Sequence, residues 1–219
     1  DALGALLGAY LMDERAIPVM PRRMNRNCRA FLSLYGADLP FVDSNDLPQG
    51  AVETVTLVDT QSMVTLKGIS SKTRVQVIDH HAQRADLPAE WQLRLEQTGS
   101  CTALFVEGLV ESDSMIQPLY ATLLLLGIYE DTGSLMYTST TARDAAAVSY
   151  LLAQGASLDI AARYLNPALS AEQRAVYDRL LADAETLTLN GQTLIVASAD
   201  ARDVSDEIST IAHKIRDLM

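Results

Sequence analysis

Cysteine is scarce in this sequence. The chain has 2 cysteines in 219 residues, Cys28 and Cys101, and no CxxC spacing connects them. A thiolate cluster for a metal is therefore not expected. Two reduced thiols in a cytosolic protein, with a role in the core rather than in catalysis, are the simplest interpretation.

Basic residues are also in short supply. Lys and Arg number 17 against 28 Asp and Glu, which gives a formal net charge of −11. This balance argues against a broad grip on the phosphate backbone of a long nucleic acid. A short anionic substrate stays compatible, because bound divalent metals can reverse the local sign of the charge.

Long apolar runs are missing as well. The longest apolar stretch, 119–129, is shorter than the roughly 20 residues that a membrane helix needs, and we see no signal peptide. We therefore expect a soluble, cytoplasmic protein without a membrane partner. The length allows one sizeable α/β domain, or one domain and part of another.

Strand and helix patterns alternate through most of the chain. Short apolar runs predict strands at 16–20, 52–58 and 75–78, whereas helices are expected at 2–12, 27–35, 100–110 and 142–154. A further apolar helix should stop at Ile128 and give way to a loop at 129–134. Alternation of this kind predicts a Rossmann-like, doubly wound parallel sheet, with ligands at the carboxyl ends of the strands.

The pattern changes after Pro167. A charged amphipathic helix within 168–188 looks like a connector, and Asn190-Gly191 reads as a turn into a strand at 193–199. A last helix is expected at 203–218. We therefore predict a core at 1–167, a connector at 168–188, and the beginning of a second, smaller α/β domain at 189–219.

Acids and imidazoles stand where the predicted elements end. Asp59 follows a strand, Asp79-His80-His81 follows the next strand, Asp131 follows a helix, and Asp1 precedes one. Taken singly, Asp59 or Asp131 fits a turn or cap residue. At one sheet edge, however, these groups would form a cluster that repels itself without cations. Mixed oxygen and nitrogen ligands suit Mn²⁺ or Co²⁺ better than Mg²⁺, and Zn²⁺ stays open.

The motif order resembles the DHH phosphoesterases. The matching segments are Asp59-Thr60, Asp79-His80-His81 and 127–134, together with Asp1-Ala2-Leu3-Gly4, which is similar to the tail of the first motif, His-x-x-x-Asp-x-Asp. Over its whole sequence, the chain is most similar to the exopolyphosphatase-related module that precedes CBS domains in some tRNA nucleotidyltransferases.

The resemblance implies a role for each motif residue. Asp59 should bridge two Mn²⁺ ions, and Asp1, His80 and Asp131 should complete the second site. Asp79 should orient an imidazole, and His81 should face the substrate. The His and first Asp of the first motif are absent before Asp1, so we expect either a missing N-terminus or the loss of one metal, and the absent first strand favours the former.

Three further residues are candidates for substrate binding. Arg26 and Asn27 lie in a segment that resembles the family, although a solvated loop fits Arg26 equally well. Ser100 could help to bind phosphate at the N-terminus of a helix. The alternative is that Ser100 is only the N-cap of that helix.

The resemblance implies a manganese-dependent phosphohydrolase that cleaves phosphoester or phosphoanhydride bonds with metal-activated water. Short single-stranded RNA or DNA, nucleoside phosphates and polyphosphate stay open as substrates, as does a homodimer. An inorganic pyrophosphatase is one alternative. The other is a catalytically idle nucleotide-sensing module inside a larger tRNA nucleotidyltransferase.

Overall fold

A computed structural model describes residues 1–165, 168–202, 204 and 208–216, and it divides the chain into two compact units. Unit 1 spans Asp1–Leu165 and unit 2 spans Asn166–Met219. The assignment of 1–167, 168–188 and 189–219 to a core, a connector and a substrate-binding domain stays a prediction.

Unit 1 contains a parallel sheet of three strands in the order β1-β2-β3. The strands are β1 (Thr54–Val58), β2 (Arg74–Asp79) and β3 (Gln92–Leu95). One face carries the buried side chains of Val55, Leu57, Val75 and Val77. On the other face, Val58 and Ile78 pack against Ala5, Cys101 and Phe105. The parallel sheet of an α/β fold is therefore confirmed.

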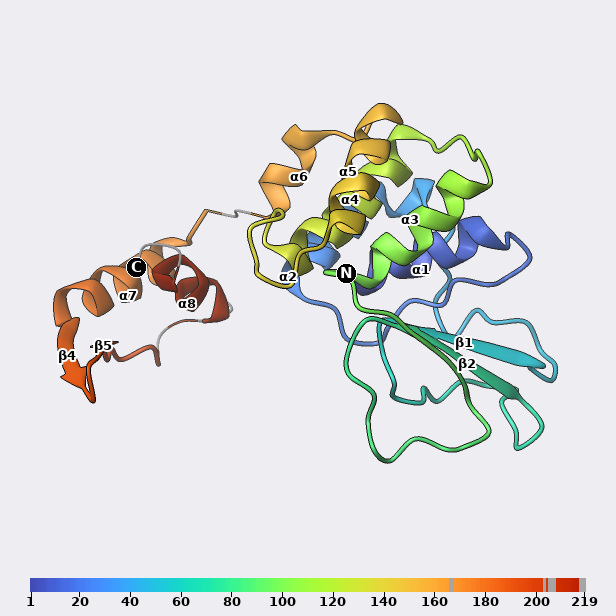
Figure 1. Ribbon diagram of the computed structural model, residues 1–219, viewed down its shortest axis with the longest axis horizontal. Coiled ribbons are helices and arrows are strands. Elements are labelled where there is room, and N and C mark those ends of the chain that lie inside the picture. Colours follow the sequence, from blue (N-terminus) through green and yellow to red (C-terminus); the bar gives the residue numbers. More distant parts are fainter. Residues whose placement is uncertain (166–167, 203, 205–207, 217–219) are drawn as a thin grey trace. The chain divides into compact units, whose positions relative to one another are not determined.

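The helices of unit 1 form most of its core. They are α1 (Ala2–Met12), α2 (Arg26–Tyr35), α3 (Cys101–Glu111), α4 (Pro118–Thr132), α5 (Ala142–Ala153) and α6 (Leu158–Leu165), with a short 3-10 turn at Gly36–Asp38. Figure 1 shows α1, α3, α4 and α5 bundled beside the strands β1 and β2. Their centre is α4, in which Leu124, Leu125 and Ile128 have no exposed surface.

Helices α1, α3 and α4 approach one another closely at Gly4, Gly127 and Thr102. A Cβ atom on Gly4 would lie 2.6 Å from Thr102 Oγ1, and one on Gly127 would lie 2.5 Å from the same atom. Only glycine fits at both positions without displacing a neighbour. This contact brings the first turn of α1, the first turn of α3 and the last two turns of α4 to one place.

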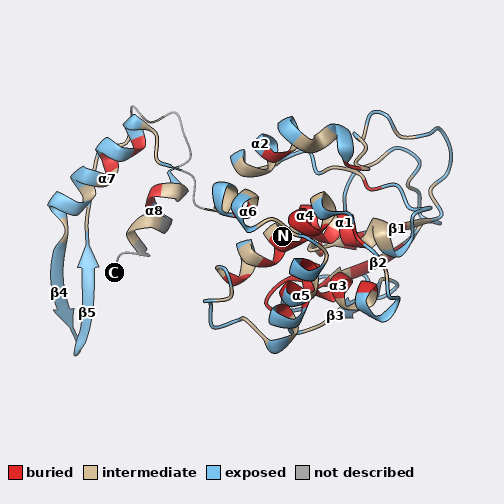
Figure 2. Ribbon diagram, turned by 90° about the horizontal axis from the view of Figure 1, so that it is seen from above, coloured by how far each residue is buried: buried red, intermediate tan, exposed pale blue. Residues whose placement is uncertain are grey.

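Unit 2 combines helices with an antiparallel hairpin. Its elements are α7 (Ala171–Asp183), β4 (Glu185–Leu189), β5 (Gln192–Val196) and α8 (Ser209–Arg216). Val176 and Ile211 are its buried apolar residues in the described part of the chain. Every residue of β4 and β5 is exposed, as the pale strands in Figure 2 show.

Several expected elements differ from the structure. The strand expected at 16–20 is a single bridge between Val19 and Val42, and β3 and β4 were not predicted. Of the helix expected at 203–218, residues 203, 205–207 and 217–218 lie outside the described residues. Within the described part of the chain, no helix is long and apolar enough to cross a bilayer.

Candidate metal centre

Asp59 and the Asp79-His80-His81 tripeptide leave the sheet at the same edge. Val58 at the end of β1 pairs with Ile78 of β2, and the main-chain nitrogen of Asp59 donates to the Ile78 carbonyl oxygen at 3.0 Å. Asp59 has a φ of 55°, a left-handed conformation that Asp adopts more readily than most residues. The chain therefore turns sharply at Asp59, directly beside the end of β2.

Two helix termini bring Asp1 and Asp131 to this edge. Asp1 immediately precedes α1, and Asp131 lies in the last turn of α4. The expectation of a loop at 129–134 was wrong for 129–132, because α4 continues to Thr132. Gly127 lies within the helix without ending it, and Gly133 ends the helix with a φ of 55°. The position of Asp131 is thus set by a helix.

Three carboxylate side chains converge on His80. Its Nε2 atom lies 3.1 Å from Asp131 Oδ2, 3.5 Å from Asp59 Oδ1 and 3.7 Å from Asp1 Oδ2. One ligand atom from each of the four residues lies within 4.8 Å of the other three. A second group with the same property contains Asp59, Asp79, His80 and His81. The structure therefore brings together all six residues for which the sequence predicted a metal or catalytic role.

The arrangement leaves polar atoms without partners. Asp59 Oδ1 and His80 Nε2 are buried and, among the described residues, have no hydrogen-bond partner of suitable geometry. A buried polar atom without a partner costs free energy. A divalent cation would satisfy both atoms and offset the repulsion between the carboxylates. The residues present therefore fit a cation with mixed oxygen and nitrogen ligands.

The electrostatics of the cluster agree with this interpretation. Burial alone lowers the pKa of His80, but the carboxylates of Asp131 and Asp59 outweigh burial and raise the pKa to about 10. Burial also raises the pKa of Asp131, and the His80 side chain reverses the direction, so that the pKa is lowered. The site thus favours positive charge at its centre, which a metal cation would supply.

Asp79 and His81 form a separate pair. The Asp79 side chain is buried, and its Oδ1 atom lies 2.8 Å from His81 Nδ1 and accepts from the main-chain nitrogen of His80 at 2.8 Å. Gln61, whose Nε2 donates to Asp79 Oδ2 at 3.0 Å, holds the other oxygen. Burial raises the pKa of Asp79, whereas the hydrogen bonds from His81 and Gln61 lower it below the ordinary value.

The start of α3 binds the carboxylate of Asp1. The main-chain nitrogen of Cys101 donates to Asp1 Oδ2 at 2.7 Å, and that of Thr102 donates to Oδ1 at 3.0 Å. The first N–H groups of a helix have no partner within the helix and favour an anion. Asp1 is therefore held in place by α3, a segment far along the chain.

The three candidates for substrate binding have different surroundings. Arg26 is an exposed residue in the first turn of α2. Asn27 Nδ2 donates to the carbonyl oxygen of Tyr164 at 2.8 Å. Ser100 has no exposed surface and is the N-cap of α3, where its side chain accepts from the Ala103 nitrogen. A role for these residues toward a substrate stays a prediction.

The sequence did not identify two residues that support the Asp79-His80-His81 tripeptide. Gln61 fixes Asp79, and the carbonyl oxygen of Thr98 lies 3.2 Å from His80 Nδ1. No local motif marks Gln61 or Thr98 in the sequence. Each becomes recognisable only when the fold places it beside its partner.

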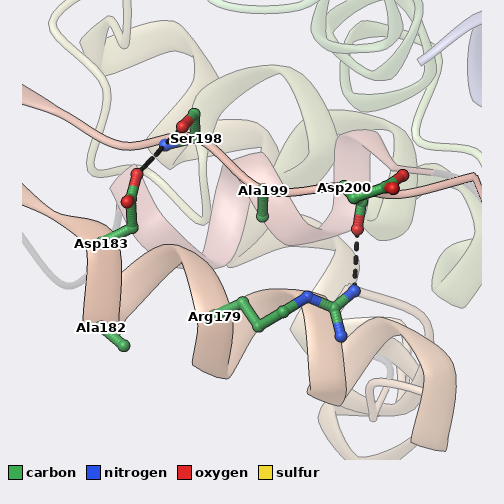
Figure 3. A pocket seen from close by; sticks show the side chains of 6 residues that line it. All are labelled: Arg179, Ala182, Asp183, Ser198, Ala199 and Asp200. Carbon is green, nitrogen blue, oxygen red and sulfur yellow. Dashed lines mark hydrogen bonds between the residues drawn. The ribbon is translucent and has the colours of Figure 1, made fainter.

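Unit 2 has an open pocket of its own. It is lined by Arg179, Ala182, Asp183, Ser198, Ala199 and Asp200. Figure 3 shows two of its side chains bonded to the main chain opposite them, since the Ser198 nitrogen donates to Asp183 Oδ2 and Arg179 Nη2 donates to the Asp200 carbonyl oxygen. Among the described residues, both groups that could hold a metal ion lie in unit 1.

Comparison with curated proteins found similar sequences, although no family model matches the chain. The chain is 33% identical over 226 residues to an A-adding tRNA nucleotidyltransferase of Geobacter sulfurreducens. The aligned region covers 100% of this chain and 26% of that protein. The chain is 24% identical to a probable manganese-dependent inorganic pyrophosphatase of Streptococcus thermophilus, over 97% of this chain and 71% of that protein. The chain thus spans about a quarter of the first relative.

Solved structures share the fold. A putative family II inorganic pyrophosphatase of Methanococcus jannaschii superposes with a TM-score of 0.57 at 20% identity, covering 99% of this chain and 73% of that one. An exopolyphosphatase-related protein of Bacteroides fragilis gives a TM-score of 0.63 at 17% identity, covering 84% and 58%.

Proposed function

We propose that this chain is a manganese-dependent phosphohydrolase, because its motif order resembles that of the DHH phosphoesterases and its fold is similar to those of the two solved structures. Its substrate is a small anionic molecule that contains a phosphoester or phosphoanhydride bond, such as a short oligonucleotide, a nucleoside phosphate or polyphosphate. We also propose that the protein is located in the cytoplasm and forms a homodimer.

One observation carries the proposal. Asp1, Asp59, His80 and Asp131 place their ligand atoms within 4.8 Å of one another. Two of these atoms, Asp59 Oδ1 and His80 Nε2, are buried without a hydrogen-bond partner among the described residues. Manganese is preferred for the mixed ligand set and because one relative is a probable manganese-dependent enzyme.

The chain's own residues then have distinct tasks. Divalent ions bound at the four-residue cluster would polarise a phosphoryl oxygen and lower the pKa of the attacking water. Asp79 accepts from His81 Nδ1 and thereby leaves Nε2 as the free ring atom. The His81 side chain is 59% exposed, so Nε2 can bind a phosphoryl oxygen or assist the leaving group.

A pyrophosphatase is the second candidate, supported by the Streptococcus and Methanococcus relatives. The similarity to an A-adding tRNA nucleotidyltransferase supports a third, a nucleotide-sensing module without hydrolytic activity. A panel of manganese-supplemented assays separates the three. It contains pyrophosphate, polyphosphate, a nucleoside bisphosphate and a single-stranded trinucleotide.

Two variants test the assignment of roles. Asp59→Asn should lose both Mn²⁺ binding and turnover, because Asp59 contributes to both groups of ligand atoms. His81→Gln should keep Mn²⁺ and turn over at least about 100-fold more slowly, as expected when an acid or base is removed. Asp46→Asn, an exposed acid in a loop, is the matched control and should behave like the wild type.

The outcomes are distinct. Wild-type Mn²⁺ affinity and activity in Asp59→Asn would refute the metal centre. Tight binding of nucleotides without cleavage of any substrate in the panel would favour the sensing module over the enzyme.

A further inference from the structure

Asp144 is a buried acid outside the metal cluster. It lies in the first turn of α5 and has no exposed surface. Its Oδ2 atom accepts from the Thr141 nitrogen at 2.8 Å, which is one bond of a capping box at the start of α5, and also accepts from Thr141 Oγ1. An exposed acid could make these local bonds equally well. The complete burial of Asp144 needs another explanation.

The same carboxylate reaches the turn that precedes α3. Oδ2 also accepts from the Gly99 nitrogen at 2.8 Å, and Oδ1 accepts from Ser100 Oγ at 3.3 Å. A Cβ atom on Gly99 would lie 2.8 Å from Asp144 Oδ2 and 2.7 Å from Thr132 Cγ2. The turn therefore packs directly on Asp144, and glycine at position 99 makes this contact possible.

The segment 98–102, which consists of this turn and the first two residues of α3, supports two of the four clustered residues. The Thr98 carbonyl oxygen lies 3.2 Å from His80 Nδ1, and the nitrogens of Cys101 and Thr102 donate to the Asp1 carboxylate. A carbonyl oxygen can only accept, so Nδ1 carries the proton. His80 Nε2 is then the ring nitrogen that faces the carboxylates, as a metal ligand requires.

We propose that Asp144 is a positioning residue of the metal centre. Asp144 fixes the position of the 98–102 segment, and this segment holds His80 and Asp1 at the cluster. The inference rests on the proposed function, since it assumes that the cluster binds a divalent ion. Asp144 itself belongs to neither group of candidate metal ligands.

Mn²⁺ binding to the full 219-residue chain, measured by electron paramagnetic resonance, tests the proposal. Asp144→Ala removes the acceptors of the Gly99 nitrogen and of Ser100 Oγ and should weaken Mn²⁺ binding by about 10- to 100-fold, the usual effect of removing a group that supports metal ligands. Asp144→Asn keeps one acceptor oxygen and should recover most of the affinity. Excess Mn²⁺ should restore the kcat of Asp144→Ala, because no ligand has been removed.

A control separates positioning from general loss of stability. Leu151→Ala removes a fully buried side chain from the same helix, α5, and should destabilise the fold but leave the Mn²⁺ affinity of the folded protein unchanged. Equal loss of affinity in Leu151→Ala and Asp144→Ala would overturn the proposal, as would wild-type affinity in Asp144→Ala.

Gly99→Ala provides a second route if Asp144→Ala does not fold. The added methyl group pushes the turn away from Asp144, so Mn²⁺ affinity should fall although the carboxylate is intact. Unchanged affinity in Gly99→Ala would then overturn the proposal. Wild-type protein that binds no Mn²⁺ refutes the metal centre itself, whereas wild-type binding with unchanged variants refutes the role of Asp144 alone.

Discussion

Unit 1 and unit 2 bury their apolar residues to different extents. In unit 1, α4 has Leu124, Leu125 and Ile128 fully buried, and the inward-facing residues of β1 and β2 are buried as well. In the described part of unit 2, the hairpin β4–β5 exposes every residue, including Leu189 at 59% and Val196 at 53%. Figure 2 shows the contrast.

The contrast bears on where a metal centre can form. Ligands must be held in nearly fixed positions, and close packing of the supporting elements is what fixes them. The cluster of unit 1 sits where α1, α3, α4 and the sheet meet. The pocket of unit 2 is lined by Arg179 and Asp183 of α7 and by the chain after β5, and the buried apolar residues in the described part of that unit are Val176 and Ile211.

The largest difference between the units should appear in core truncations. Leu124→Ala should lower the free energy of unfolding by about 2–5 kcal/mol. Leu194→Ala, at a residue 41% exposed, should cost less than about 1 kcal/mol. Urea titration followed by fluorescence of the single tryptophan, Trp91, reports on unit 1, and far-UV circular dichroism reports on the whole chain. Equal effects of the two substitutions would remove the contrast.

Manganese should stabilise unit 1 selectively. At a concentration 100 times the dissociation constant, Mn²⁺ should raise its free energy of unfolding by about 2.7 kcal/mol. Hydrogen exchange should slow at the amides of Cys101 and Thr102 and stay unchanged in β4 and β5.

Asp59→Asn should abolish this stabilisation, whereas Asp46→Asn should preserve it. Equal protection of the hairpin and of the start of α3 would contradict a site confined to unit 1.

Gln61→Leu should lower the free energy of unfolding by about 1–3 kcal/mol, because it leaves the buried Asp79 Oδ2 atom without its amide donor. Gln61 Nε2 donates to Asp79 Oδ2 at 3.0 Å, and Gln61 Oε1 accepts from the Arg84 nitrogen at 2.9 Å. Gln49→Leu, at an exposed position, is the matched control. Urea titration with Trp91 fluorescence measures both, and a Gln61→Leu protein as stable as the control would show that the amide is dispensable.

The smallest effect is expected from ion pairs. Arg143 connects α5 to Glu107 of α3 and to Glu96, with a distance of 2.6 Å from Nη2 to Glu96 Oε2. Hydrogen bonds from Arg94 and Arg143 lower the pKa of Glu96 below its ordinary value of 4.5. This pairing therefore stabilises the fold fully above pH 4.5, and the stabilisation is lost as the pH falls through the lowered pKa.

Arg143→Met should lower the free energy of unfolding by at most about 1 kcal/mol at pH 7. Below pH 4.5, the free energy of unfolding of the variant should depend less on pH than that of the wild type. Arg202→Met in unit 2 removes an exposed pair with Asp200, two residues away, and should have no measurable effect. Thermal unfolding between pH 3 and pH 7 compares the two variants. If the stability of Arg143→Met depends on pH in the same way as that of the wild type, the Arg143–Glu96 pair does not make the predicted contribution.

Local patterns predicted the fold where the chain carries strong signals. The apolar runs before Asp59 and Asp79 are strands, and the capping box at Thr141 begins α5 as expected. β3 was missed because Gln92-Leu93-Arg94-Leu95 alternates polar and apolar residues over only four positions. The loop expected at 129–132 was wrong because Glu130 and Asp131 do not end a helix, whereas Gly133, with a φ of 55°, does.

The residues around Asp144 show why a site is harder to predict than a strand. Thr141 and Asp144 are neighbours in sequence, and their capping box follows from spacing alone. The bond from Gly99 to Asp144 joins segments far apart in the chain, and nothing in either segment marks the other.

By itself, the sequence determined which chemical groups are available, since the acids and imidazoles at the ends of elements and the alternation of strands with helices are local properties of the chain. Only the tertiary structure decided that Asp1, Asp59, His80 and Asp131 meet within a few ångströms, and that Gln61, Thr98 and Asp144 hold the groups around them. The reason is physical: hydrogen bonds and packing between distant segments depend on how helices α1, α3 and α4 approach one another at Gly4, Gly127 and Thr102, and no single segment contains that geometry.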